Sequence, residues 1–203
     1  YWRKAAVDWL DPQGHQRILD VATGTADVAL EIASRVSGPL RVVGLDFSRP
    51  MLALGRKKVR EENLDPTIVL HPGCGQHLPF SEASFDGVVT AFGIRNFTDV
   101  DAGLAEMHRV LKPGGRAVIL EFSRPRNPVL AGMYRFYFHA VLPRVGRWVS
   151  GHPQAYQYLP DSVAQFPTRE AFSRRMQNAR FRVVEYRDLT FGIVTLYRGT
   201  KDD

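Results

Sequence analysis

One stretch, RILDVATGTAD from Arg17 to Asp27, constrains the fold of this chain more than any other feature. The apolar pair Ile18–Leu19 predicts a short buried strand that ends at Asp20. Small residues then allow a sharp turn at Gly24, and Asp27 opens a segment whose apolar residues recur at helical spacing. A strand, a glycine turn and a helix in this order predict the start of a βαβ unit that binds a nucleotide at the turn.

The glycine pattern argues against a dinucleotide as the ligand. A pyrophosphate loop has the pattern G-x-G-x-x-G, whereas this turn contains Gly24 alone. Asp20 and Asp27 flank the turn, and their carboxylates would repel a pyrophosphate and attract an amino group and a sulfonium. These are the charges of S-adenosylmethionine, so we predict that Asp20 and Gly24 contact this cofactor. A turn with a purely structural role is the alternative.

A second predicted strand supports a nucleoside ligand. The apolar run at residues 40–45 ends in Asp46, about 20 positions after the glycine turn. An acidic residue at this place suits the paired hydroxyls of a ribose. NAD-binding enzymes share this acid, so Asp46 does not choose the cofactor, and it can also serve only as a carboxylate at a helix start.

The rest of the chain alternates between apolar runs and amphipathic segments. Helices are predicted over residues 1–10, 27–36, 49–63, 97–111 and 168–179, and strands over 18–19, 40–45, 67–70, 84–92, 116–122, 182–189 and 193–200. Met51, Leu52, Leu54 and Val59 are expected to face inward. We therefore predict an α/β fold of the class I, Rossmann-like type, with a mostly parallel seven-stranded sheet. The last two strands form an antiparallel hairpin, which is typical of class I methyltransferases and unusual for dinucleotide enzymes.

Length and composition limit the remaining classes. The 203 residues predict one domain, 1–203, and the single Cys74 cannot form an internal disulfide and fits a reducing compartment. No metal-ligand spacing is present, so we expect no metal site. The first residues read as the middle of a helix, so the natural N-terminus is expected to lie upstream.

Aromatic and basic residues fill an expected helical insertion at about residues 127–167. The net charge of +6 is unevenly distributed, because from Arg116 to Arg147 every basic residue is Arg and Glu121 is the only acid. Arg135, Arg144 and Arg147 lie among aromatic residues, which suits contact with an anionic bilayer surface. A helical cover packed on the sheet is the alternative.

The order of several motifs resembles a known family. The motifs are DVATGTAD, LPF-x(4)-FD, FGIRN, RVLKPGG, LEFSRP, HAVLPRVG and YQYLPDSV-x(2)-FP, and together they span the whole chain. They resemble the ubiquinone/menaquinone biosynthesis C-methyltransferases. The resemblance implies transfer of a methyl group from S-adenosylmethionine to a ring carbon of a polyprenylated demethyl-quinol. It does not separate naphthoquinol from benzoquinol, and we slightly favour demethylmenaquinol.

The resemblance also implies cofactor contacts. These fall on Thr25, Asp46, Cys74, Gly75 and Ala91. The family usually has Asp or Asn where Cys74 stands, often Glu at the place of Gln76, and commonly Ser at the place of Ala91. A thiol is a weak hydrogen-bonding group, so the main-chain N–H of Gly75 and the Gln76 side chain are expected to carry more of the adenine contact.

Four residues are candidates for handling the acceptor and its proton. A hydroquinone activates its own ring carbon, so alignment and a nearby base are what the protein must supply. Arg95 and Asn96 follow a predicted strand at the edge where ligands bind, and His139 and Tyr158 are further candidates. An ion-pair role for Arg95 and a helix-face role for His139 are the alternatives.

Other functions give different expectations. An NAD(P)-binding oxidoreductase would use the same βαβ unit, and a non-catalytic S-adenosylmethionine-binding subunit of a quinone-synthesis complex would tolerate Cys74 and Ala91. No catalytic motif of a nucleic-acid methyltransferase is present, so we expect no nucleic-acid partner. The expected partners are a lipid-tailed quinol and an anionic membrane surface. The protein is expected to be cytoplasmic and to associate peripherally with the inner face of the membrane. A homodimer is left open.

Overall fold

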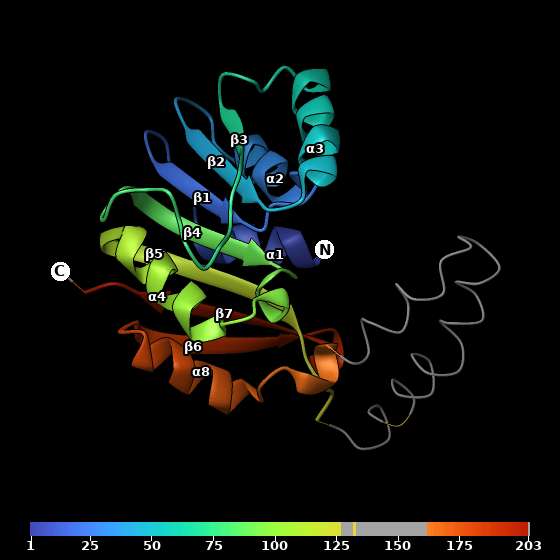
Figure 1. The fold of residues 1–203 in the computed structure, drawn as a ribbon, viewed down its shortest axis with the longest axis vertical. Helices are drawn as coiled ribbons and strands as arrows, with labels where there is room; N and C mark the ends of the chain where they lie inside the picture. Colours follow the sequence, from blue (N-terminus) through green and yellow to red (C-terminus); the bar gives the residue numbers. More distant parts are fainter. Residues whose placement is uncertain (127–131, 133–161, 203) are drawn as a thin grey trace.

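A seven-stranded sheet forms the centre of the computed structural model, which describes residues 1–126, 132 and 162–202 (Figure 1). The strand order is β3-β2-β1-β4-β5-β7-β6. The strands are β1 (Arg17–Val21), β2 (Arg41–Asp46), β3 (Ile68–Pro72), β4 (Phe85–Ala91), β5 (Leu111–Phe122), β6 (Arg182–Leu189) and β7 (Val194–Thr200). The first five strands pair in parallel, and β7 inserts antiparallel between β5 and β6. The predicted parallel sheet with a C-terminal antiparallel hairpin is confirmed.

Helices cover both faces of the sheet, which is why the central strands are apolar on both sides. Each face of the sheet has its own group of buried apolar residues. One group lies under α1, α2 and α3, and the other lies under α4 and α8. The helices are α1 (Trp2–Leu10), α2 (Asp27–Arg35), α3 (Arg49–Glu61), α4 (Val100–Val110) and α8 (Arg169–Asn178), with 3-10 turns η1 (Ile94–Asn96) and η3 (Thr190–Gly192). No helix among residues 1–126 and 162–202 has the length and apolar character needed to cross a bilayer.

Several predicted boundaries differ from the structure. Helix α4 begins at Val100 because the Asp99 side chain accepts the Ala102 N–H at 3.0 Å and caps it there. Residues 97–99, which were predicted to be helical, lie outside any helix, between η1 and α4. Strand β5 begins at Leu111 rather than at residue 116. The predicted insertion at about 127–167 lies largely outside the described residues.

The prediction for the buried face of α3 was partly wrong. Leu52 and Val59 are buried as expected, but Met51 and Leu54 are 41% and 53% exposed. Gly55 takes the inward position between Leu52 and Val59. A Cβ atom on Gly55 would lie 2.9 Å from the Leu70 side chain. The helix therefore packs closely on the sheet through a glycine, and the apolar Met51 is left for another surface.

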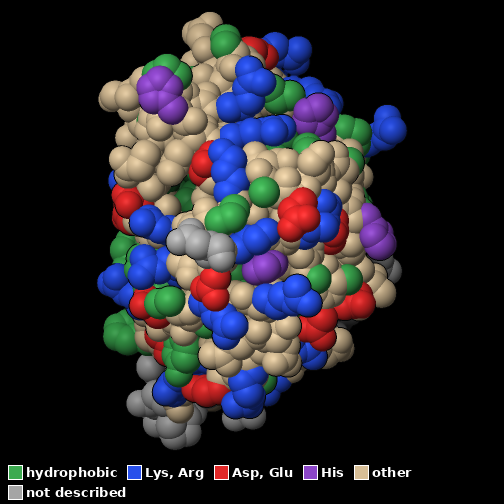
Figure 2. All heavy atoms as spheres, turned by 90° about the vertical axis from the view of Figure 1, so that its left-hand side faces the viewer, with side chains coloured by type: hydrophobic (Ala, Val, Ile, Leu, Met, Phe, Trp, Pro, Cys, Tyr) green, Lys and Arg blue, Asp and Glu red, His purple; other side chains and the backbone are tan. Residues whose placement is uncertain are grey.

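The amino ends of the parallel strands form a face with mixed charge. Figure 2 shows Lys and Arg side chains beside Asp and Glu on this face. Lys112 pairs with Asp86 at 2.7 Å, and Arg116 pairs with Asp11 at 3.0 Å. Within the expected basic stretch, Arg116 is thus paired at the edge opposite the carboxyl ends of the strands.

Candidate active site

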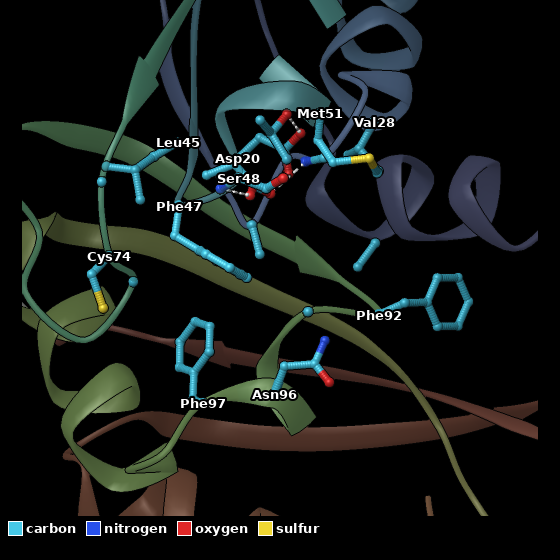
Figure 3. Close-up of a pocket in the computed structure, with 18 of the residues that line it drawn as sticks. Asp20, Val28, Leu45, Phe47, Ser48, Met51, Cys74, Phe92, Asn96 and Phe97 are labelled. Atoms are coloured by element: carbon cyan, nitrogen blue, oxygen red, sulfur yellow. Dashed lines mark hydrogen bonds between the residues drawn. The ribbon is translucent and has the colours of Figure 1, made fainter. Parts of the chain in front are cut away.

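A cavity of about 750 Å³ lies at the carboxyl ends of β1, β2 and β4 (Figure 3). This is the edge at which open parallel sheets bind their ligands. All seven residues predicted to contact a cofactor line this cavity: Asp20, Gly24, Thr25, Asp46, Cys74, Gly75 and Ala91. The structure thus brings together residues that are up to 71 positions apart in the sequence (91 − 20). Their individual contacts with a ligand stay predictions.

The turn after β1 has the left-handed backbone that its small residues allow. Gly24 has a φ of 57°, and Ala26, which precedes α2, has a φ of 65°. The Thr23 hydroxyl donates to Asp20 at 2.6 Å, and the Thr23 N–H donates to the Leu45 carbonyl at 3.0 Å. These bonds hold the turn against the ends of β1 and β2, beside the cavity.

Asp46 is fixed by two main-chain hydrogen bonds. One carboxylate oxygen accepts the N–H of Gly24 and the other accepts the N–H of Ser48, both at 2.8 Å. The side chain is 6% exposed. Each carboxylate oxygen has a second lone pair, so Asp46 can still accept two hydroxyl groups from a ligand.

Asp20 is a buried carboxyl at the floor of the cavity. It is 1% exposed, and burial raises its pKa to about 7, with smaller contributions in the same direction from Asp46 and Asp27. The Thr23 hydroxyl opposes this shift. One Asp20 oxygen, Oδ1, has no hydrogen-bond partner among the described residues. Asp20 lines the cavity, and an ionised carboxyl in its wall suits a cationic hydrogen-bond donor on the ligand.

Thr25 is held at the start of α2. Its hydroxyl accepts a hydrogen bond from the Lys58 Nζ at 2.9 Å, and the same ammonium pairs with Asp27 at 2.6 Å. Lys58 therefore neutralises one of the two acids that flank the glycine turn. Asp20 and Asp46 also line the cavity, and neither of them forms an ion pair with Lys or Arg among the residues that the structure describes.

Apolar side chains that the sequence did not reveal form two walls of the cavity. Phe47 follows Asp46 directly and is 78% exposed, and Met51 also lines the cavity. In Figure 3, Phe47 and Phe97 lie on opposite sides of the cavity, with Cys74 toward one end and Phe92 toward the other. Flat apolar walls on two sides suit an aromatic ring system between them. The sequence signal for this wall was an aromatic residue, Phe47, directly after the acid at the end of β2.

Two glycines leave the space that the Phe97 ring occupies. A Cβ atom on Gly75 would lie 2.3 Å from the Phe97 ring, and one on Gly103 would lie 2.4 Å from it. Both distances are shorter than any van der Waals contact, so glycine at both places lets the ring fit between the Cys74 loop and α4. Gln76 supports the same loop, because its Oε1 accepts the Thr98 N–H at 3.1 Å.

The four predicted catalytic residues are in different situations. Asn96 lines the cavity, on η1. Arg95 does not line it and instead pairs with the buried Glu121 at 2.9 Å, beside a second cavity of about 310 Å³. The ion pair considered for Arg95 is therefore present, and its catalytic role stays a prediction. His139 and Tyr158 lie outside the described residues.

The sequence matches known proteins along almost its whole length. The model of the ubiE/COQ5 methyltransferase family matches residues 1–201. The chain is 50% identical over 200 residues to "Ubiquinone/menaquinone biosynthesis C-methyltransferase UbiE" of Geobacter sp. (strain M21), covering 98% of this chain and 85% of that protein. It is 46% identical to "Demethylmenaquinone methyltransferase" of Deinococcus radiodurans, again over 98% of this chain, and 81% of that protein.

Solved structures agree on the fold. Phosphoethanolamine N-methyltransferase 2 of Haemonchus contortus, in complex with S-adenosyl-L-methionine, matches with a TM-score of 0.75 at 16% identity, over 99% of this chain and 52% of that chain. A second solved structure, from Bacillus halodurans, gives a TM-score of 0.71 at 17% identity, over 99% of both chains. These likenesses show the class I methyltransferase fold. Together with the family model and the identity to its relatives, they establish that this chain belongs to the ubiE/COQ5 methyltransferase family.

Proposed function

We propose that this chain methylates a ring carbon of demethylmenaquinol, with the benzoquinol of the ubiquinone pathway as the alternative acceptor. Membership of the family makes it an S-adenosylmethionine-dependent C-methyltransferase of quinone biosynthesis. Relatives at 42% and 46% identity are named demethylmenaquinone methyltransferases, which favours the naphthoquinol. Relatives at 50% identity carry a name that includes both pathways, so the benzoquinol stays as the second candidate.

One observation carries the cofactor assignment. The Asp20 carboxyl, the glycine turn and Asp46 meet at one cavity that also has apolar walls. We assign Asp20 to an amino group, Asp46 to ribose hydroxyls, and Phe47 and Phe97 to the base. S-adenosylmethionine has these groups, and it supplies a methyl group on a positively charged sulfur when it is bound.

The residues of the chain then have to align the acceptor and manage its proton. A hydroquinone ring carbon becomes more nucleophilic as a ring hydroxyl loses its proton, so a group near that hydroxyl aids the reaction. Asn96 lies at the cavity and can orient the hydroxyl through its amide. Arg95 precedes Asn96 in the chain, and stabilisation of a phenolate by its positive charge would require the guanidinium to turn from Glu121 toward this cavity. Phe92 and Phe97 add apolar surface to the same region of the cavity.

The acceptor carries a prenyl tail, so the protein has to meet the bilayer. Extraction of the tail into water costs about 0.8 kcal/mol for each CH₂ group. Arg135, Arg144 and Arg147, with the aromatic residues among them, supply charge and apolar surface for an anionic membrane. We propose that the protein works from the cytoplasm at the inner face of the membrane and binds that surface peripherally.

The test is methylation of both quinols by the purified protein, followed by mass spectrometry. We expect kcat/KM to be higher for demethylmenaquinol than for the benzoquinol. The opposite order would assign the ubiquinone pathway. Arg95→Ala and Asn96→Ala should lower turnover by about tenfold or more and leave the affinity for S-adenosylhomocysteine within about twofold. Near-normal turnover of either variant at saturating quinol would remove that residue from the mechanism.

A further inference from the structure

Glu121, at the carboxyl end of β5, is a fully buried acid whose contacts all lead to the acceptor side of the cavity. Its side chain is 0% exposed. Its Oε1 accepts the Arg95 Nη1 at 2.9 Å and the Phe122 N–H at 2.8 Å. Its Oε2 accepts the main-chain N–H of Arg95 at 3.2 Å. One carboxylate thus accepts hydrogen bonds from both the side chain and the backbone of Arg95.

Besides Glu121, Arg95 contacts Phe92 and Phe122. Its Nη1 also donates to the carbonyl of Phe92, and its guanidinium lies 5.5 Å from the centre of the Phe122 ring. Phe92 has a φ of 59°, a left-handed conformation that is uncommon for a residue with a side chain. The bond to its carbonyl helps to keep this conformation. Residues 92–96 are therefore tied to β5 at Phe92 and at Arg95.

The segment 92–96 forms the wall between the two cavities. Phe92, Gly93 and Asn96 line the larger cavity, and Arg95 lines the smaller one. In Figure 3, Asn96 and Phe92 lie at the same end of the large cavity, away from Cys74. The orientation of Asn96 depends on the backbone of η1, and that backbone is hydrogen-bonded to Glu121 through Arg95.

We propose that Glu121 is a positioning residue for the methyl transfer, because it holds segment 92–96, through Arg95, so that Asn96 faces the acceptor. This inference rests on the proposed function. Glu121 touches neither the cofactor side of the cavity nor its glycine turn, since it is absent from the residues that line the cavity. Its effect is therefore on alignment of the acceptor, and small misalignments of reacting groups lower rates strongly.

The experiment compares Glu121→Gln with a matched control, Glu106→Gln. Glu106 on α4 also binds one guanidinium and one main-chain N–H, from Arg109 at 2.6 Å and Leu78 at 2.7 Å, but it does not line either cavity. We expect Glu121→Gln to lower kcat by about tenfold or more, with the affinity for S-adenosylhomocysteine within about twofold of the wild type by calorimetry. Glu106→Gln should keep both values.

Hydrogen–deuterium exchange supplies a readout that does not depend on activity. Amides 92–97 should exchange faster in Glu121→Gln than in the wild type and in Glu106→Gln. An unchanged kcat with unchanged exchange, or an equal loss of kcat and cofactor affinity, would overturn the inference. If the wild type methylates neither quinol, the proposed function fails, and the exchange data still decide whether Glu121 holds this segment.

A second variant covers the case in which Glu121→Gln does not fold. Glu121→Asp keeps the charge beside Arg95 and withdraws the carboxylate by one methylene group. It should fold, because no buried guanidinium loses its counter-charge. We expect the same pattern, a lower kcat with the cofactor affinity retained, and a normal kcat together with normal exchange of amides 92–97 would overturn the inference.

Discussion

The carboxylate of Asp46 accepts the main-chain N–H of Gly24 at 2.8 Å, so the acid at the end of β2 is bonded directly to the turn that follows β1. The two features that first indicated a nucleoside ligand are therefore parts of one structure. Asp46 has two tasks, to keep the turn in place and to accept the hydroxyls of the ligand. Removal of its carboxylate should affect both.

Asp46→Ala should weaken S-adenosylmethionine binding by about tenfold or more, because hydrogen bonds to a charged group are worth roughly 1.5–3 kcal/mol. Isothermal titration calorimetry gives the affinity, and thermal unfolding shows whether the fold is retained. Asp65→Ala removes an exposed carboxylate away from the cavity and is the control. Equal affinities of the Asp46 variant and the wild type would show that Asp46 does not hold the ribose.

The affinity for S-adenosylmethionine should rise with pH through neutrality. Burial raises the pKa of Asp20 to about 7, so the ionised fraction increases about tenfold between pH 6 and pH 8, and the ionised form attracts the cationic ligand. Asp20→Asn should bind more weakly at pH 8 and lose most of this dependence. Adenosine carries no positive charge at these pH values and is the control ligand. A flat profile for the wild type would contradict the role of Asp20.

The same carboxyl gives a prediction for the stability of the protein without ligand. Its pKa is raised from 3.8 to about 7 in the folded state, so the folded protein binds more protons than the unfolded chain between these values. The contribution of Asp20 to the free energy of unfolding therefore falls as the pH rises from about 4 to about 7. Urea unfolding at several pH values should show a smaller fall in Asp20→Asn than in the wild type.

Gly103→Ala should destabilise the protein, although alanine is normally favoured over glycine in a helix by about 1 kcal/mol. The new Cβ atom would meet the Phe97 ring at 2.4 Å, and overpacking of this kind costs about 1–3 kcal/mol. The displaced ring would also lower cofactor affinity. Gly14→Ala is the control, since its nearest neighbour would lie at 4.0 Å. Phe97→Leu in the Gly103→Ala background should restore stability but not full cofactor affinity.

The sequence predicts what depends on short-range patterns. The glycine turn, the acid of β2 and the terminal hairpin were visible because strand and helix periodicity, turn residues and spacing along the chain specify them. The position of Gln76 beside Thr98 and of Phe97 between two glycines depends on packing between distant segments, which no local pattern encodes.

The errors have the same physical origin. Met51 was expected in the core because it is apolar, but the cavity gives it an apolar environment at the surface, and Gly55 takes the buried place. The partner of Arg95 could not be identified, since Glu121 is 26 residues away and only the pairing of β4 with β5 brings the two together. Sites formed by the ends of several strands are therefore only partly visible in the sequence.

Arg169→Met should lower the free energy of unfolding by about 3 kcal/mol, because it leaves a largely buried network without its cation. The Arg169 side chain is 8% exposed, pairs with Asp188 and donates to the Gly192 carbonyl at 2.9 Å. Arg182→Met removes an exposed pair with Asp202 and should cost less than about 1 kcal/mol. Urea unfolding measures both, and equal losses would contradict the buried role of Arg169.

Binding to anionic vesicles should depend on salt. Each Arg near an anionic surface contributes on the order of 1 kcal/mol, so replacement of Arg135, Arg144 and Arg147 by Gln should reduce co-sedimentation. The triple variant should lose activity on a long-tailed quinol and keep it on a short-tailed analogue. Neutral vesicles are the control. If the wild type does not bind anionic vesicles at low salt, the proposal of a membrane-facing segment fails.

The hydrogen bond of 3.2 Å between Arg169 and the Ser123 hydroxyl joins the place where the chain leaves β5 to the place where it enters α8. Everything between these two residues begins and ends at one point on the sheet. Insertions with closely spaced ends can change in length and sequence with little effect on the domain that carries them. The chain between Ser123 and Arg169 can therefore change in length and sequence while β5, α8 and the cofactor cavity keep their arrangement.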